Sequence, residues 1–360
     1  MTTAPVFPAL CFGKLPTFAD FVRHNAGGRE VLAFDQWLQH GIHHARTELR
    51  DEWETSYRHA PAYRFVFFPE NSESLLLGVL QPSHDRSERS YPFIVCLRID
   101  RRLSANRLPL IPMLFSSFLD DASLLVEDAR SESMTLQQLA ERTEALCAPV
   151  ECDYANLSRA YEMRLSSTNP DQLRALVWNG DGSERAQTLF KNLIDVLVPL
   201  RGRNAGRLAL GLRFPLPAEP SSQSFTASFW LLTSCALMGI NWPRPFFFWT
   251  APSPLALRSA TSSSNGTHGE THAVEQAHLF LFLRQPSVSA FRALLRPDLA
   301  SESICAVDGD SLGGAGDGRV ALPSRLAATM SAPDRNLLEL LDVLGGSLPR
   351  TSGAHIGMAT

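Results

Sequence analysis

Two short polar stretches of the chain contain residue types that could do chemistry. In the first, Gly13 and Lys14 follow an apolar run that begins at Ala9, which is how a phosphate-binding loop finishes. Such a loop also needs an earlier glycine and a serine or threonine after the lysine. No glycine precedes Gly13, Leu15 follows the lysine, and Pro16 removes a backbone N–H that a phosphate would use. The sequence therefore disfavours a nucleotide site, and a strand that ends in a turn is the simpler interpretation.

The second stretch, residues 81–93, contains Ser83, His84 and Asp85 in a row, the residue types of a hydrolytic triad. Catalytic triads are assembled in space, and adjacent side chains of an extended segment point to different sides. The contiguous order therefore has no special meaning, and a charged hairpin is the simpler interpretation. In it Asp85 would pair with Arg86 or Arg89, and exposed pairs of this kind contribute little energy.

Both stretches are expected to leave strand ends at one edge of an N-terminal domain. If the two loops meet there, Asp85 can also pair with Lys14. A shared site requires these two side chains to lie on the same face of the molecule. The residues expected to converge at this edge are Gly13, Lys14, Asp20, Asp85, Arg86 and Arg89.

The composition is that of a globular protein, since 44% of the 360 residues are hydrophobic and 19% are charged. The net charge of −4 shows no basic surplus, so neither nucleic acid nor an anionic membrane is an expected partner. The N-terminus lacks the basic and apolar regions of a signal peptide, which predicts a cytoplasmic protein. The most apolar windows, 228–240 and 278–283, are too short to cross a bilayer, so no membrane insertion is expected.

No metal or cofactor is expected. The six cysteines are scattered without the spacing of a metal site. His40 and His44 stand four residues apart, which is a metal-ligand spacing, but Gly41 replaces the glutamate of an H-E-x-x-H site. Both histidines also fall opposite the apolar stripe of their helix, so we interpret them as surface residues.

The clearest element is a helix over residues 28–49. Its apolar residues recur at steps of three and four, and they are Val31, Phe34, Leu38, Ile42, Ala45 and Leu49. The polar residues beside them, Asp35 among them, are expected to point elsewhere. Three strands follow at 63–68, 74–80 and 91–99, separated by turns too short for parallel crossovers. Helices are predicted at 108–129 and 135–146, so the first half has the order β-α-β-β-β-α-α.

The second half begins near Pro149, where a polar stretch is typical of a domain boundary. Helices are predicted at 184–200, 224–238 and 287–297, with strands around 206–217, 245–250 and 277–283. The sequence thus predicts a layered α/β (α+β) sandwich with a largely antiparallel sheet. We expect an N-terminal domain at 1–150, a C-terminal α/β region at 151–345 and a flexible tail at 346–360. Gln-Pro-Ser follows a strand in both halves, which leaves open duplication or chance.

Several segments together resemble the TagF (ImpM) family of bacterial type VI secretion-associated proteins, over roughly residues 9–130. The family pattern contains Gly-Lys-Leu-Pro, Gly-Asp-Phe, Trp-Leu-Gln, Ala-Pro-x-x-Arg-Phe and Pro-Ser-x-Asp-Arg-x-Gly-Arg. In this chain the pattern falls on Gly13 to Pro16, Asp20 and Phe21, Trp37 to Gln39, Ala60, Pro61, Arg64 and Phe65, and on Pro82, Ser83, Asp85, Arg86 and Arg89. Two positions depart from it, because Ala19 and Glu88 stand where the family has glycine.

The resemblance implies a non-catalytic, post-translational repressor of type VI secretion that binds the forkhead-associated scaffold protein of the system. The positions that it marks as partner-binding or motif residues are Gly13, Lys14, Leu15, Pro16, Asp20, Phe21, Trp37, Pro82, Ser83, Asp85, Arg86 and Arg89. Arg86 and Arg89 would lie at the rim of the interface, where their replacement should hardly change stability.

Two other functions stay open at this point. One is an enzyme with a site near Lys14, Asp20 and Asp85, which would need a deep pocket with perturbed titratable groups. The other is a general scaffold module outside type VI secretion. The sequence does not decide the oligomeric state.

Overall fold

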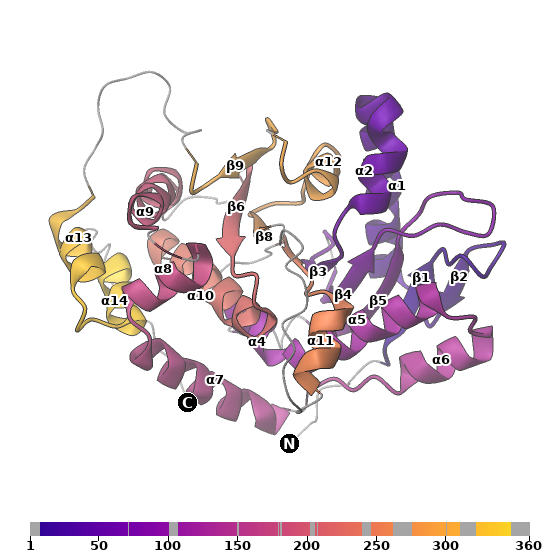
Figure 1. Ribbon diagram of the computed structural model, residues 1–360, viewed down its shortest axis with the longest axis horizontal. Helices are drawn as coiled ribbons and strands as arrows, with labels where there is room; N and C mark the ends of the chain where they lie inside the picture. Colours follow the sequence, from indigo (N-terminus) through magenta and orange to yellow (C-terminus); the bar gives the residue numbers. More distant parts are fainter. Residues whose placement is uncertain are drawn as a thin grey trace.

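Apolar strands form one continuous sheet in the computed structural model, and helices lie around it (Figure 1). The structure describes residues 8–70, 72–100, 107–149, 151–178, 180, 182–201, 206, 208–239, 246–261, 276–299, 301–309 and 322–346. The elements of the first half are β1 (Leu10–Gly13), β2 (Val22–His24), α1 (Arg29–Leu49), α2 (Trp53–His59), β3 (Tyr63–Phe67), β4 (Ser74–Gln81), β5 (Phe93–Asp100), α4 (Ile111–Leu114), α5 (Ser116–Ser131) and α6 (Leu136–Glu144).

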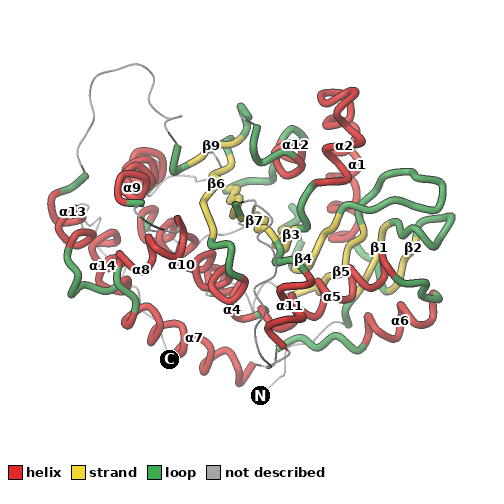
Figure 2. Tube along the Cα trace, viewed as in Figure 1, coloured by secondary structure: helices red, strands yellow, loops and turns green. Residues whose placement is uncertain are grey.

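The second half contributes more helix. Its elements are α7 (Glu151–Ser167), α8 (Pro170–Trp178), α9 (Ser183–Leu197), β6 (Gly211–Leu216), α10 (Pro220–Met238), β7 (Phe246–Thr250), α11 (Pro254–Thr261), β8 (Ala277–Phe282), α12 (Ala290–Leu295), β9 (Ile304–Ala306), α13 (Ser324–Ser331) and α14 (Leu337–Gly346). In Figure 2 the strands cross the middle of the molecule and helices lie around them.

The described strands form a nine-stranded sheet in the order β2-β1-β5-β4-β3-β7-β8-β6-β9. Neighbouring strands are antiparallel except for β6 and β9, which are parallel. The predicted antiparallel run of three strands is confirmed, since β3, β4 and β5 are neighbours in the sheet. The two halves join where β3 pairs with β7, from Tyr63 opposite Thr250 to Val66 opposite Phe247. The α/β class with a largely antiparallel sheet is therefore confirmed.

Helices α1 and α12 cover one face of this sheet. The ring of Phe34 on α1 lies 4.6 Å from that of Phe65 on β3, centroid to centroid. Tyr63, on the same face of β3, donates from its hydroxyl to the carbonyl of Leu294 on α12, at 2.8 Å. The predicted apolar stripe of α1 is confirmed, because Phe34 and Leu38 are fully buried and Ile42 is half-buried against the core.

Helices α5 and α10 cover the opposite face. Arg64 on β3 forms an ion pair with Asp120 of α5. The cross-strand partners of Arg64 continue through Trp249 and Leu279 to Phe214, so these residues share its face. Phe214 stacks on Trp230 of α10, with 5.9 Å between the ring centroids. The sheet therefore lies between two helical layers, as the sandwich prediction requires.

This placement bears on the question of an internal duplication. The antiparallel pairing of β3 with β7 admits a twofold axis perpendicular to the sheet, and such an axis keeps each helix on its own face. Helices α1 and α10 occupy the same position in the β-α-β-β order of the two halves, yet they cover opposite faces. A twofold duplication about this axis is therefore not supported.

The polar stretch that follows the predicted domain boundary is helical. Residues 151–167 and 170–178 form α7 and α8. The α7 side chains of residues 154–167 are exposed or half-buried except for Tyr154, Tyr161 and Leu165, which form a narrow buried line. Because the buried line of α7 is so narrow, its apolar residues gave too weak a periodic pattern to predict a helix from the sequence. The short strands β2 and β9 and the helices α2, α8, α11, α13 and α14 also went unpredicted.

The domain limits at 150 and 345 stay a prediction. Except for Gly346, the tail predicted at 346–360 lies outside the described residues. Within the described part of the chain, no single helix is long and apolar enough to span a membrane. One bent pair, Leu108–Leu114 with Ser116–Ser131 at 60° to each other, has the length and composition only when taken together.

Candidate functional site

The two polar loops meet beside the ends of β1 and β5. Lys14 lies in the loop after β1 and Asp85 in the loop between β4 and β5, and the lysine Nζ is 3.1 Å from the carboxylate Oδ2. The backbone N–H of Arg86 donates to the carbonyl of Phe18 at 2.9 Å, which fixes the loops side by side. The predicted convergence of Lys14 and Asp85 on one face is confirmed.

Asp85 is the centre of this arrangement. Its side chain is fully buried, and four donors surround its two oxygens. Lys14 Nζ lies at 3.1 Å and Arg89 Nε at 2.7 Å, while the backbone N–H groups of Ser87 and Arg89 donate at 2.9 and 3.0 Å. We call Lys14, Asp85, Ser87 and Arg89 the Asp85 cluster. Its carboxylate is satisfied as a buried charge must be.

The cluster holds Asp85 in its ionised form. Burial alone would raise the pKa of this carboxyl, but the backbone N–H of Arg89, the Lys14 ammonium and the backbone N–H of Ser87 outweigh burial. Together they lower the pKa from 3.8 to about 2. A carboxylate with so low a pKa is a poor proton acceptor near neutral pH. The geometry therefore favours a structural role for Asp85 over general-base chemistry.

Arg89 differs from its predicted role. Its side chain is 59% exposed, as expected for a rim residue. Its guanidinium nevertheless holds the buried Asp85 and donates from Nη2 to the carbonyl of Ala19 at 2.8 Å. Removing one partner of a buried charge is costly. We therefore now expect that replacing Arg89 lowers the stability of the fold, whereas the Arg86 side chain is exposed and forms no ion pair with the described residues.

The glycine of Gly-Lys-Leu-Pro has a steric explanation. Gly13 has a φ of +130°, and a Cβ placed on it would lie 2.1 Å from the carbonyl oxygen of Pro92. Leu15 is fully buried and Pro16 half-buried, so this turn packs on the core. The apparent phosphate-loop ending is thus a close approach of two backbones.

The two departures from the family pattern have different consequences. Glu88 stands in the left-handed region with φ of 61°, where a glycine costs nothing sterically. Its side chain pairs at 3.0 Å with Arg58 at the surface. Ala19 has no positive φ, so its position does not demand glycine.

The Ser-His-Asp run does not form a triad. The Asp85 carboxylate accepts from Lys14 and Arg89, whereas His84 contacts the Asp85 carbonyl through Nδ1 at 3.0 Å. Ser83 is buried, and its hydroxyl has no hydrogen-bond partner among the described residues. Its carbonyl instead accepts from the N–H of Tyr91 at 3.0 Å, and Pro82 beside it is also buried.

The remaining predicted residues fall in different surroundings. Asp20 is exposed and forms no ion pair with any residue that the structure describes. Phe21 is half-buried, with its ring 5.0 Å from that of Tyr91. Trp37 is buried against the second half of the chain, where its Nε1 donates to the carbonyl of Pro286 at 2.9 Å. Trp37 therefore joins the halves and is not open to a partner.

Sequence reasoning missed a second buried carboxylate near the loops. Asp35 is buried, contrary to prediction, and accepts from the Tyr91 hydroxyl at 2.5 Å and from Gln39 at 3.1 Å. Arg23 lies 3.3 Å from its other oxygen. Burial, and then the hydrogen bond to Asp35, raise the pKa of Tyr91 well above its usual value. An acidic residue next to Phe34, on the apolar side of a helix, was the available signal.

Arg64 is a buried cation on the other side of the sheet. It is 1% exposed, and burial lowers its pKa although Asp120 opposes the shift. Its Nε has no hydrogen-bond partner among the described residues. This cation lies on the α5 face of the sheet, opposite the α1 face, so it does not join the Asp85 cluster.

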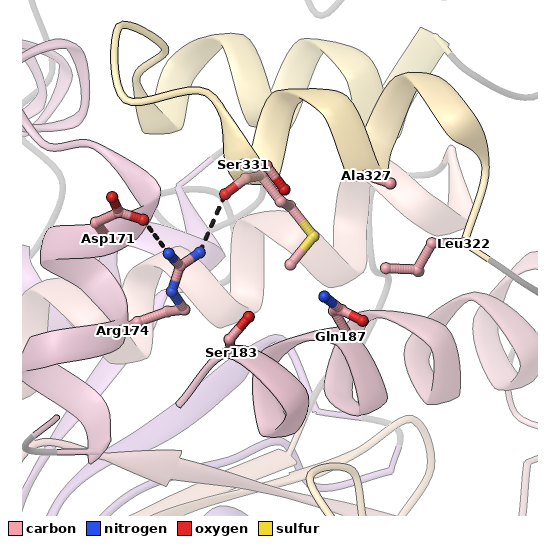
Figure 3. Close-up of a pocket in the computed structure, with 8 residues that line it drawn as sticks. Asp171, Arg174, Ser183, Gln187, Leu322, Ala327 and Ser331 are labelled. Atoms are coloured by element: carbon pink, nitrogen blue, oxygen red, sulfur yellow. Dashed lines mark hydrogen bonds and ion pairs between the residues drawn. The ribbon is translucent and has the colours of Figure 1, made fainter. Parts of the chain in front are cut away.

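A cavity of about 400 Å³ lies in the second half, between α8, α9 and α13 (Figure 3). Arg174 projects into it, pairs with Asp171 and donates from Nη1 to the carbonyl of Met330 at 3.0 Å. Ser183 and Gln187 of α9 line its floor. Because the one guanidinium of its lining is already paired, the cavity offers no evident charge for a ligand.

The region that contains the Asp85 cluster is similar to a known protein family. Residues 11–146 match the family model described as the TagF N-terminal domain, type VI secretion system-associated. Among solved structures, PA0076 from Pseudomonas aeruginosa PAO1 is 24% identical, with a TM-score of 0.36. That alignment covers 39% of this chain and 63% of PA0076, which is less than two thirds of its length. No curated protein matches the chain.

Proposed function

Residues 11–146 are the N-terminal domain of the TagF family of type VI secretion system-associated proteins, and from this premise we propose a regulatory function. The protein is a non-catalytic, post-translational repressor of the bacterial type VI secretion system. It acts in the cytoplasm by binding the forkhead-associated scaffold protein and withholding that protein from assembly.

The Asp85 cluster is the observation that carries this proposal. Two of the motif's cations, Lys14 and Arg89, hold one buried carboxylate. These charged residues of the family pattern thus fix the shape of the loop between β4 and β5. The residues between Asp85 and Arg89 in that loop remain exposed to solvent. A rigid loop with an aromatic residue and exposed polar residues beside it suits a protein interface.

The same cluster argues against the enzyme alternative. An enzyme using Lys14, Asp20 and Asp85 would need a titratable group poised near neutral pH. Asp85 is held far below that range, and Asp20 is exposed at the surface. If the region nevertheless served catalysis, Asp20→Asn would abolish repression without weakening partner binding, and this variant tests that alternative.

Two measurements test the proposal together. The purified full-length protein is titrated calorimetrically with the forkhead-associated protein of the same genome, and secretion is measured in a deletion strain with and without complementation. We expect a saturable complex and increased secretion in the deletion strain, reversed by the wild-type gene. Absence of binding together with unchanged secretion would overturn the proposal and favour a scaffold role outside type VI secretion.

A further inference from the structure

The cations around the two loops differ in whether they are neutralised. Lys14 and Arg89 both lie within ion-pair distance of the buried Asp85 carboxylate. Arg86, in the same turn, is exposed and forms no ion pair with any described residue. Glu88, two residues further on, is engaged by Arg58 at 3.0 Å. The charge of Arg86 is therefore not engaged by any acidic side chain in the described part of the chain.

The backbone that carries Arg86 is held on both sides. Its own N–H donates to the Phe18 carbonyl at 2.9 Å, and the N–H of Asp85 donates to the Arg89 carbonyl at 3.2 Å. The Asp85 carboxylate also accepts from the N–H of Ser87, directly after Arg86. A loop whose backbone is already fixed loses less conformational entropy when it binds.

The surface next to Arg86 has the composition of an interface. Phe18, whose carbonyl accepts from the Arg86 N–H, packs on the core but remains half-exposed, and Ser87 is exposed. Aromatic residues and arginines are enriched among the side chains that dominate binding energy. An arginine with no intramolecular carboxylate fits best a carboxylate supplied from outside, because the bidentate geometry of its guanidinium matches that group.

We propose that the turn around Arg86, with Phe18 and Ser87 beside it, is the surface that contacts the partner protein, and that Arg86 binds a carboxylate there. This inference rests on the proposed function, since it deepens the binding step of that function. The partner surface is acidic. Arg89 contributes through the shape of the loop, by neutralising Asp85, and Arg86 alone contributes its charge to the complex.

Calorimetric titration of the forkhead-associated protein with three forms of the full-length protein tests this inference. The forms are wild type, Arg86→Glu and the control Arg46→Glu, which reverses an exposed arginine of α1 that has no ion pair within the described part of the chain. We expect Arg86→Glu to weaken binding by about tenfold or more and Arg46→Glu to change it by less than about twofold. Added salt should weaken the wild-type complex more than the Arg86→Glu complex.

Thermal unfolding separates a lost contact from a lost fold. Arg86→Glu should unfold within about 1 °C of wild type, because an exposed and unpaired charge contributes little to stability. If the wild type binds and Arg86→Glu binds equally well, the contact surface is elsewhere and only this inference fails. If the wild type does not bind at all, the proposed function fails and the inference falls with it.

Discussion

The Asp85 cluster and helix α10 both contain buried polar side chains, but they differ in whether those side chains have hydrogen-bond partners. In the cluster, the Asp85 carboxylate meets four donors. Helix α10 is almost wholly buried and carries four side chains with a polar atom that has no partner among the described residues. These are Gln223, Thr226, Ser228 and Thr233.

The buried polar groups of the cluster are hydrogen-bonded and fix the shape of a loop, whereas the unpartnered polar atoms of α10 lower the stability of the fold. A buried polar atom without a partner costs about 1–3 kcal/mol, whereas a satisfied one is roughly neutral or favourable. Three residues of the cluster, Lys14, Asp85 and Arg89, belong to the family pattern, and the cluster fixes the loop that we propose for binding. The hydroxyls of Thr226, Ser228 and Thr233 make no such contact among the described residues, so their removal should be tolerated.

The largest effect is expected from Gly13→Ala, at the edge of the cluster. A Cβ there would lie 2.1 Å from the Pro92 carbonyl oxygen, and the φ of +130° is unfavourable for alanine. The folded state should lose about 3 kcal/mol or more, measured by urea unfolding. Gly27→Ala is the matched control, since a Cβ at Gly27 meets nothing within 4 Å. Similar losses in both variants would show that the close approach is not the cause.

Arg89→Glu should have the next largest effect. It removes a partner of the buried Asp85 and places a negative charge beside it, so we expect a loss of about 2–3 kcal/mol. Arg86→Glu, three residues earlier and unpaired, should change the free energy of unfolding by less than about 0.5 kcal/mol. Equal values for the two variants would contradict the distinction between the cluster and its exposed turn.

The free energy of unfolding at acidic pH tests the contribution of the Asp85 carboxylate itself. Because its pKa is about 2 in the folded protein and near 3.8 when unfolded, its contribution is present above pH 4 and is lost as the pH falls toward 2. The difference in unfolding free energy between wild type and Asp85→Asn should therefore shrink over that interval. A difference that stays constant from pH 5 to pH 2 would mean that the carboxylate is not held ionised by the cluster.

Much of the fold could be predicted from periodicity. The stripe of α1 and the branched runs of β3, β4 and β5 carry strong local signals, and their bounds agree with prediction to within two residues. The meeting of Lys14 with Asp85 also followed, because both leave strand ends. Local sequence does not show how much of a loop is buried by the rest of the fold. The burial of Asp85, and the structural role that Arg89 gains by pairing with it, were therefore not predicted.

Contacts between distant segments set the other limit. The Nε1 of Trp37 donates to Pro286, 249 residues away in the sequence, and only the pairing of β3 with β7 brings the halves together. Asp35 is buried because Tyr91 reaches it from beyond the next two strands. Its place beside Phe34 on α1 is a signal of burial, but nothing within α1 shows that Tyr91 covers it. The family pattern includes Trp37 but does not say that this residue packs inside the molecule.

The smallest expected effect tests the other side of the comparison, with one substitution made at two buried threonines. Thr233 on α10 has a hydroxyl without a partner among the described residues, whereas the Thr143 hydroxyl on α6 donates to the Leu139 carbonyl at 2.7 Å. Thr233→Val should therefore stabilise the fold by about 1 kcal/mol, and Thr143→Val should destabilise it by a similar amount. Both changes exchange a hydroxyl for a methyl in a fully buried helix position, so differences in volume and helix propensity cancel. Urea unfolding of the two variants gives the comparison directly. If both lose stability equally, the Thr233 hydroxyl is satisfied in solution, and the contrast between the Asp85 cluster and α10 does not hold.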